Sequence, residues 1–181
     1  MISLTLARKY ARALIEIGLQ ERNYEALGKD LEKMADLIKA NKELKAVLLS
    51  PAYPVVTRKA IAKVVVTEVL GLHKSTIDFI DMLIERKRMD HFPEIARSYE
   101  SLCDAVSRRI RATLVTAMGF PPELVRAIKS QLESSTGKEV ILSVEEDASL
   151  IGGVLTRIGN VIYDGTLKTQ LAKVKENLYK E

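Results

Sequence analysis

The chain has 181 residues, of which 47% are hydrophobic and 29% are charged, and this balance excludes a disordered protein. Aromatic residues make up 5% and tryptophan is absent, so a core must be built mainly from Leu, Ile, Val and Ala. The net charge of +4 is too small to imply nucleic-acid binding, and one cysteine excludes an internal disulfide framework.

Nothing in the chain has the pattern of a membrane segment. No stretch is apolar over the roughly 18 residues that a spanning helix needs. Arg8, Lys9 and Arg12 interrupt the apolar residues at the start of the chain, which is unlike a signal peptide. We therefore expect a cytosolic protein whose association with any membrane is indirect.

The first three helices follow one another closely. The first is expected to run to about Gln20, with Ser3 or Thr5 as its cap, because short hydroxyl side chains accept bonds from free backbone N–H groups. A second helix begins at Asn23, and a short third helix covers residues 41–50.

Three more helices are expected before the pattern changes. Thr57 would cap a fourth helix that ends at Gly71, and valines 64–66 belong to it because their flanks are helical. A fifth helix starts at residues 75–76, and a sixth starts near Pro93 with an apolar residue every three or four positions. Six short helices with short loops predict a bundle.

After Arg111 the pattern becomes that of a small α+β unit. The expected elements are a strand at 112–118, a helix opening at Pro121-Pro122 and closed by Gly137, a strand at 140–144, a hairpin turning at Gly159-Asn160, and a last helix capped by Asp164. The predicted fold is mainly α, with a six-helix bundle over residues 1–110 and an α+β domain over residues 111–181.

Candidate chemical groups do not converge. His73 and His91 lie far apart, and neither has another metal ligand at suitable spacing. Cys103 lies on the apolar stripe of the sixth helix, where it packs as a small hydrophobe. Residues 145–147 are acidic, but neighbours on an extended segment point to opposite faces. Gly152-Gly153 precedes a strand, unlike a phosphate-binding loop. We expect no catalytic residue, cofactor or metal site.

Two basic clusters, at residues 86–88 and 108–111, are interpreted as solvated helix ends. They keep open a different function, in which a basic adaptor protein binds RNA or an anionic membrane. A small enzyme with a site assembled from residues interpreted here as structural is a further alternative.

The first helix is apolar over more of its circumference than packing on one side requires. Its apolar and small residues are Leu6, Ala7, Tyr10, Ala11, Ala13, Leu14, Ile17 and Gly18. A central position in the bundle and a surface that binds a partner helix explain this pattern equally well.

Three segments of the chain form a recognisable set. They are Ala7 to Leu14, then Phe79 to Ile84 with Phe92-Pro93-Glu94-Ile95, and finally Glu146 to Gly153 with Asp164-Gly165-Thr166. Together they resemble the family of bacterial ATP synthase delta subunits, relatives of the mitochondrial oligomycin-sensitivity-conferring protein. The family pattern has Pro at the position of Ala148 and Ser at that of Thr166, and both are mild departures. The order of the segments agrees over the whole chain.

This resemblance implies a non-catalytic stator subunit that links the peripheral stalk to the catalytic head and resists rotor torque during proton-driven ATP synthesis. The family's helical domain holds the N-terminal helix of an alpha subunit between its first and fifth helices. Carried over, the contact residues are Ala7, Tyr10, Ala11, Leu14, Phe79, Ile80 and Leu83.

The C-terminal domain of the family engages the C-terminal end of the b-subunit stalk. The motif residues expected to shape that domain are Asp147, Gly152, Gly153, Asp164 and Gly165. The resemblance also implies one copy per complex, a monomer when isolated, no nucleic-acid partner, and a peripheral place on the cytoplasmic face of the bacterial plasma membrane.

Overall fold

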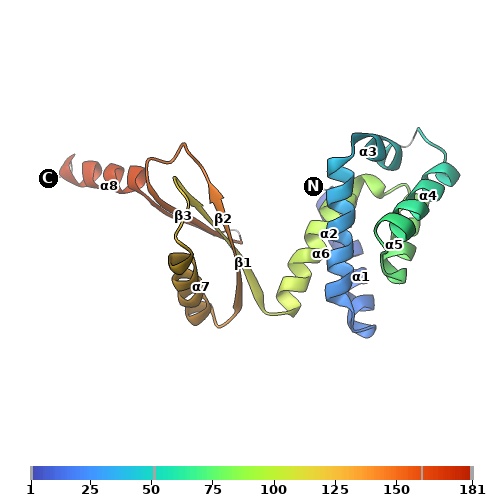
Figure 1. Cartoon of the computed structure of the whole chain (residues 1–181), viewed down its shortest axis with the longest axis horizontal. Coiled ribbons are helices and arrows are strands. Elements are labelled where there is room, and N and C mark those ends of the chain that lie inside the picture. The colour runs from blue at the N-terminus through green and yellow to red at the C-terminus, as the bar shows by residue number, and fades with distance from the viewer. Residues whose placement is uncertain (1, 51, 160, 180–181) are drawn as a thin grey trace. The chain divides into compact units, whose positions relative to one another are not determined.

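The computed structural model describes residues 2–50, 52–159 and 161–179. The chain divides into two compact units, residues 1–103 and 104–181, and each is described by itself (Figure 1). The boundary predicted between residues 110 and 111 falls inside the first strand of the second unit.

The N-terminal unit is built from helices. They are α1 (Ile2–Gln20), α2 (Tyr24–Ala40), α3 (Lys42–Leu49), α4 (Val55–Val64), α5 (Lys74–Glu85) and α6 (Phe92–Val106), with a π-helical segment η1 (Val65–Val69) and a 3₁₀ turn η2 (Met89–His91). The unit therefore contains more helical segments than the six predicted. Residues 64–66 are helical as predicted, but the α-helix gives way to η1 within this run.

The predicted start of a helix matches the structure where a side chain caps the first backbone N–H groups. Asn41 accepts a bond of 2.9 Å from the backbone N–H of Leu44 at the start of α3. Thr57 does not cap α4, because Pro54 occupies the cap position and Thr57 lies inside the helix. Thr5 likewise lies within α1, which begins at Ile2.

One apolar core holds the helices of the N-terminal unit together. Its largest fully buried side chains are Leu14, Leu27, Leu31, Met34, Leu48, Ile80, Leu83, Ile84, Met89, Phe92, Ile95 and Tyr99. The hydroxyl of Tyr99 donates to the backbone oxygen of Tyr24 over 2.9 Å, so its polar end is satisfied inside this core. Burial raises the pKa of Tyr99, which keeps the hydroxyl protonated.

Two buried charged side chains cap helices from a distance. Asp30 of α2 accepts the backbone N–H of His73 over 2.7 Å and the hydroxyl of Thr76 over 3.1 Å, so it caps the start of α5. Arg58 of α4 is 2% exposed and donates from Nε and Nη2 to the oxygen of Leu48 in the last turn of α3. The cation thereby meets the negative end of the α3 dipole.

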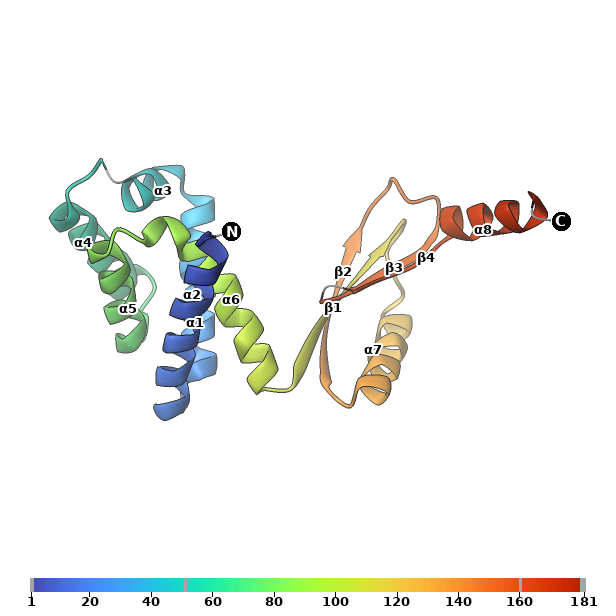
Figure 2. The same ribbon diagram turned by 180° about the vertical axis from the view of Figure 1, so that it is seen from behind.

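The C-terminal unit is a four-stranded sheet with two helices. Its elements are β1 (Arg109–Thr116), α7 (Pro122–Thr136), β2 (Glu139–Glu146), β3 (Gly153–Ile158), β4 (Val161–Thr166) and α8 (Leu167–Tyr179). The strand order is β2-β1-β3-β4, with β1 parallel to β2 and the other pairs antiparallel. The predicted hairpin is confirmed by the pairing of Ile158 with Val161. Figure 2 shows β4 continuing directly into α8.

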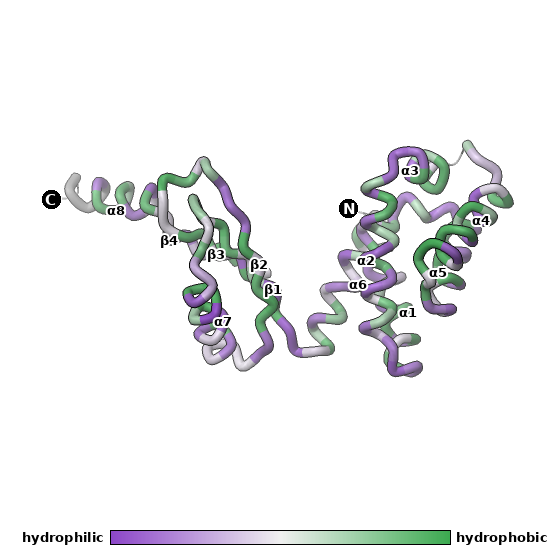
Figure 3. The backbone as a smooth tube through the Cα atoms, in the orientation of Figure 1, coloured by the Kyte–Doolittle hydropathy of each residue, from purple (hydrophilic) through white to green (hydrophobic). Residues whose placement is uncertain are grey.

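Local sequence explains these elements. Gly137 ends α7 in the left-handed conformation that the sequence predicts, with φ of 64°. Helix α7 packs against β2, and hydrophobic residues run along β1 between its neighbouring strands (Figure 3). The most buried residues of the sheet are Ala112, Leu114, Val115, Thr116 and Val140. The second core is therefore small and centred on β1.

Removal of the Asp30 carboxylate should loosen α5. We expect Asp30→Ala to lower the free energy of unfolding by about 2 kcal/mol, because α5 loses its cap and the hydroxyl of Thr76 loses its acceptor. Urea unfolding followed by circular dichroism measures the change. Asp36→Ala on the exposed side of α2 is the control, and equal losses for both variants would contradict this role.

Candidate partner-binding surface

Most of the residues predicted to meet a partner helix lie inside the N-terminal unit. The side chains of Ala7, Ala11, Leu14, Ile80 and Leu83 are each at most 1% exposed. Phe79, at 7% exposed, also belongs to the buried core, and only Tyr10 of the predicted residues is partly buried. In the isolated chain the six buried residues are part of the core and do not form an accessible surface.

Tyr10 and Phe79 join α1 to α5. Their rings pack edge to face, with centroids 6.3 Å apart and an angle of 71° between the planes. Ile17 follows Tyr10 by two turns of α1, and Met82 follows Phe79 by one turn of α5, so each pair lies on the same side of its helix. The exposure of these neighbours shows that Tyr10 and Phe79 lie at the border of the buried side. Ile17 is 43% exposed and Met82 is partly buried.

We call this surface the α1–α5 seam, defined by Leu6, Tyr10, Ile17, Phe79 and Met82. Its residues are all apolar or aromatic, and they follow the helical spacing that a second amphipathic helix needs for contact. From the sequence, Leu6 and Ile17 are expected on the apolar side of α1, but neither is predicted to contact a partner. Leu6 precedes Tyr10 by four residues and Ile17 follows it by seven, and this helical spacing is the signal that places them on the same side.

Polar contacts fix the end of the α1–α5 seam. The hydroxyl of Ser75, in the first turn of α5, donates to Glu21, just beyond α1, over 2.7 Å. This bond lowers the pKa of the Glu21 carboxyl, with a further contribution from the amide of Asn23. Asn23 also lies 3.3 Å from the His73 ring at the cap of α5. The start of α5 is thus tied to the turn that follows α1.

The glycine motif residues of the C-terminal unit converge where α8 begins. Gly153 pairs with Thr166, and Val154 pairs with Gly165. A Cβ atom on Gly153 would lie 2.4 Å from the backbone oxygen of Gly165, and the φ of Gly153 is +84°. Gly152 accepts the backbone N–H of Leu167 over 3.0 Å. The absence of side chains lets β3 approach the β4–α8 junction closely.

The two motif aspartates organise the loops around this junction. Asp164 accepts the backbone N–H of Thr166 over 2.9 Å and the hydroxyl of Thr169 over 2.8 Å. It lies inside β4, so the prediction that Asp164 caps α8 is wrong: the cap is Thr166, whose hydroxyl accepts the backbone N–H of Thr169 over 3.4 Å. The bonds that Asp164 accepts lower its pKa, and the backbone bond from Thr166 contributes most. Asp147 accepts the backbone N–H of Ser149 over 2.9 Å at the turn after β2.

Helix α8 exposes an apolar stripe. Its exposed members are Leu167 at 45%, Leu171 at 64% and Val174 at 56%. They are spaced by four and three residues and therefore lie on one side of the helix. Contiguous apolar side chains on a helix are usually covered by another part of the protein or by a partner. The α8 stripe is therefore a second candidate contact surface.

No arrangement for chemistry appears in the described part of the chain. Within it, no cluster of three or more His, Cys, Asp or Glu side chains is placed to hold a metal ion. His73 caps α5, and Cys103 lies 3.6 Å from the backbone oxygen of Tyr24. Among the same residues, no helix has the length and apolar character needed to span a bilayer.

Comparison with known proteins agrees with this two-unit architecture. The family described as ATP synthase delta (OSCP) subunit matches residues 6–178. The chain belongs to this family. It is 38% identical to the ATP synthase subunit delta of Geobacter metallireducens and 36% identical to that of Geotalea uraniireducens, each over 99% of both chains.

The fold of the chain is also found in a solved structure. A chain in the cryo-EM structure of the Toxoplasma gondii mitochondrial ATP synthase hexamer superposes with a TM-score of 0.75. At 20% sequence identity, it covers 96% of this chain and 97% of its own length. Family membership thus accounts for the order of the three motif segments in both units.

The close approach at Gly153 predicts an unequal response to alanine. Gly153→Ala should destabilise the C-terminal unit by more than about 3 kcal/mol, because the added methyl group meets backbone as well as a positive φ. Gly159→Ala has a φ of +56° but no atom within 4 Å, so it should cost only about 1–2 kcal/mol. Thermal unfolding of both variants measures the difference, and similar losses would refute the steric explanation.

The hydrogen bonds that Asp164 accepts predict a pH dependence of stability. Because the folded-state pKa of Asp164 is lowered, the stabilisation is present above the ordinary aspartate value and is lost as pH falls below about 4. The stability difference between the native chain and Asp164→Asn should therefore shrink between pH 6 and pH 3. Urea titrations at both pH values measure it, and a difference that is unchanged at pH 3 would argue against this role of the Asp164 carboxylate.

Proposed function

We propose that the chain is a two-ended joint, in which the α1–α5 seam holds the N-terminal helix of an alpha subunit and the C-terminal unit holds the end of the b-subunit stalk. Membership of the family supports the general function of the chain. The chain is a structural, non-catalytic subunit of F-type ATP synthase, and its role is that of a stator. The finer assignment of partners to the two units rests on the surfaces described above.

The task sets a scale for the strength of these contacts. Each charge that crosses the membrane delivers about 2.3 kcal/mol per 100 mV, and several charges are needed for each ATP. A stator joint must therefore withstand work of roughly 10 kcal/mol in each catalytic step. A nanomolar contact corresponds to about 12 kcal/mol, so a joint of this affinity has the required strength.

The α1–α5 seam supports the assignment of the alpha helix. Apolar burial supplies about 25 cal/mol per Å², so an amphipathic helix lying along two others can reach the required scale before its ordering costs. Within the seam Tyr10 and Phe79 pack against each other, Ile17 is 43% exposed and Met82 is partly buried. The tethered start of α5 keeps this surface in one arrangement.

The α8 stripe supports the assignment of the stalk. Leu167, Leu171 and Val174 present an apolar side at the end of the C-terminal unit, and an amphipathic stalk helix could bury them. Asp164 and the glycines of the motif shape the start of α8 without facing a partner. Their proposed role is to aim the helix.

The proposed setting is the cytoplasmic face of a bacterial plasma membrane, with one copy in each complex and a monomer in isolation. The rival function, a basic adaptor for RNA or membranes, has less support. In the cluster at residues 108–111, Arg109 pairs with Glu139 over 2.8 Å and Arg111 pairs with Asp104 over 2.7 Å. These ion pairs reduce the charge available for phosphate groups.

A pair of substitutions on α1 tests the seam. Ile17→Asp should weaken binding of a synthetic peptide with the sequence of the alpha N-terminal segment by at least about tenfold, because a charge would face an apolar helix. Isothermal titration calorimetry with the full chain measures the dissociation constant.

Leu19→Asp is the matched control, because Leu19 is 44% exposed but points to another side of the same helix. Its affinity for the peptide should stay within about twofold of the native value. If both variants keep the affinity of the native chain, the seam is rejected as the binding surface. If both lose affinity equally, the loss reflects a general effect of acidic residues on α1.

A further inference from the structure

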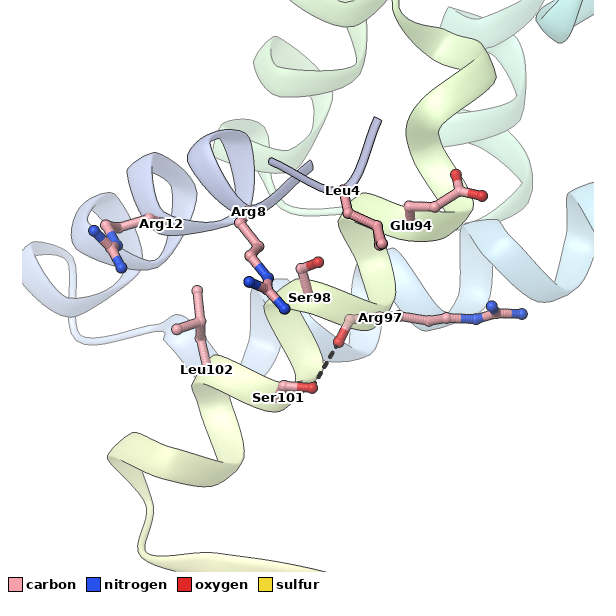
Figure 4. Close-up of a pocket in the computed structure, with 8 residues that line it drawn as sticks. All are labelled: Leu4, Arg8, Arg12, Glu94, Arg97, Ser98, Ser101 and Leu102. Atoms are coloured by element: carbon pink, nitrogen blue, oxygen red, sulfur yellow. Dashed lines mark hydrogen bonds between the residues drawn. The ribbon is translucent and has the colours of Figure 1, made fainter. Parts of the chain in front are cut away.

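Helix α1 has a second flank that differs from the seam in chemistry. Arg8 and Arg12 lie two residues before and after Tyr10, which places them on another side of the helix. There they line a depression between α1 and α6 (Figure 4). The lining residues are Leu4, Arg8, Arg12, Glu94, Arg97, Ser98, Ser101 and Leu102.

The arginines of this depression form no ion pair with another described residue. In the part of the chain that the structure describes, no carboxylate pairs with Arg8, Arg12 or Arg97. All three are exposed, and Figure 4 shows Arg8 reaching from α1 toward Ser98 of α6. Arg8 and Arg12 are also four residues apart on one helix, where like charges repel. An anion between them would relieve this repulsion.

The one acid in the depression does not serve as that anion. The Oε2 atom of Glu94 is buried and has no hydrogen-bond partner. A buried carboxylate oxygen without a donor is costly, so an occupant that offers an N–H or hydroxyl group beside Glu94 would gain free energy. A well-matched occupant would therefore offer hydrogen-bond acceptors to the arginines and a donor to Glu94.

We propose that this α1–α6 depression binds an acidic segment of a partner polypeptide in the assembled ATP synthase. Carboxylates of that segment meet the guanidinium groups, which bind them in a bidentate geometry. Leu4, which is 53% exposed, and Leu102 offer apolar contact at the two ends. A free phosphate would use neither leucine, and the lining has no aromatic ring on which a base could stack.

The proposal rests on the chain's place in the ATP synthase but not on the α1–α5 seam. Two flanks of one helix would then hold two different segments, one by apolar burial and one by charge. Binding through the arginines should weaken as the salt concentration rises, whereas binding through the apolar seam should not.

Zero-length crosslinking in the purified complex tests this. Arg8→Lys and Arg97→Lys keep the charge and add an amine, which a carbodiimide joins to a carboxylate in contact with it. We expect crosslinks from both positions to Asp or Glu residues of another subunit, identified by mass spectrometry. Arg126→Lys, at an exposed position of α7, is the control and should give none at those residues.

A second measurement separates the possible occupants. The double variant R8Q/R97Q should rebind ATP synthase stripped of this subunit at least about tenfold more weakly at low salt, with unchanged thermal unfolding. Crosslinks only to Glu94 of the same chain, or none, would overturn the proposal. So would phosphatidylglycerol vesicles that bind the native chain but not R8Q/R97Q. Failure of the α1–α5 seam would instead leave these crosslinks in place.

Discussion

The burial of α1 is the constraint on which the N-terminal unit depends. Ala7 and Ala11 are fully buried, and a Cβ atom on Gly18 would lie 2.8 Å from the Cα atom of Tyr24. Small residues along this side let neighbouring helices approach closely. Once that side is fixed, the residues at its borders are fixed as well, and they include Tyr10 and Ile17 on the apolar flank.

The structure accommodates both explanations of the apolar first helix. A central position accounts for Leu14 and Ile15, which are at most 5% exposed. The proposed partner surface would account for Ile17, which the core leaves 43% exposed. Periodicity could not separate these roles, because a side chain facing the core and one facing a foreign helix have the same polarity. The seven residues carried over from the family therefore included six that the bundle itself buries.

Element boundaries were predictable where local chemistry decides them. Asn41 and Gly137 mark helix ends through a side-chain bond and a left-handed backbone, and both positions are as expected. Thr57 failed as a cap because the chain enters α4 through Pro54, whose fixed φ suits that entry equally well. The caps that Asp30 and Arg58 provide join different helices, so no local pattern revealed them.

The C-terminal motif illustrates the same limit. Its glycines could be located from the sequence, but the reason for them is the contact between Gly153 and Gly165, which only the pairing of β3 with β4 creates. Asp164 then holds Thr166 and Thr169 at the start of α8, a helix whose apolar side faces solvent in the isolated chain. In both units a buried arrangement of small or capping residues lies beside an apolar surface, which we propose a partner covers.

The central claim is that a foreign helix lies on the flank of α1 that faces α5. NMR titration of the labelled full chain with the alpha N-terminal peptide tests it most directly, since every amide reports its own surroundings. The account predicts the largest shifts around Tyr10, Ile17, Phe79 and Met82, with little change near Leu19. Shifts that cluster elsewhere in the chain, or a spectrum unchanged at saturating peptide, would contradict it.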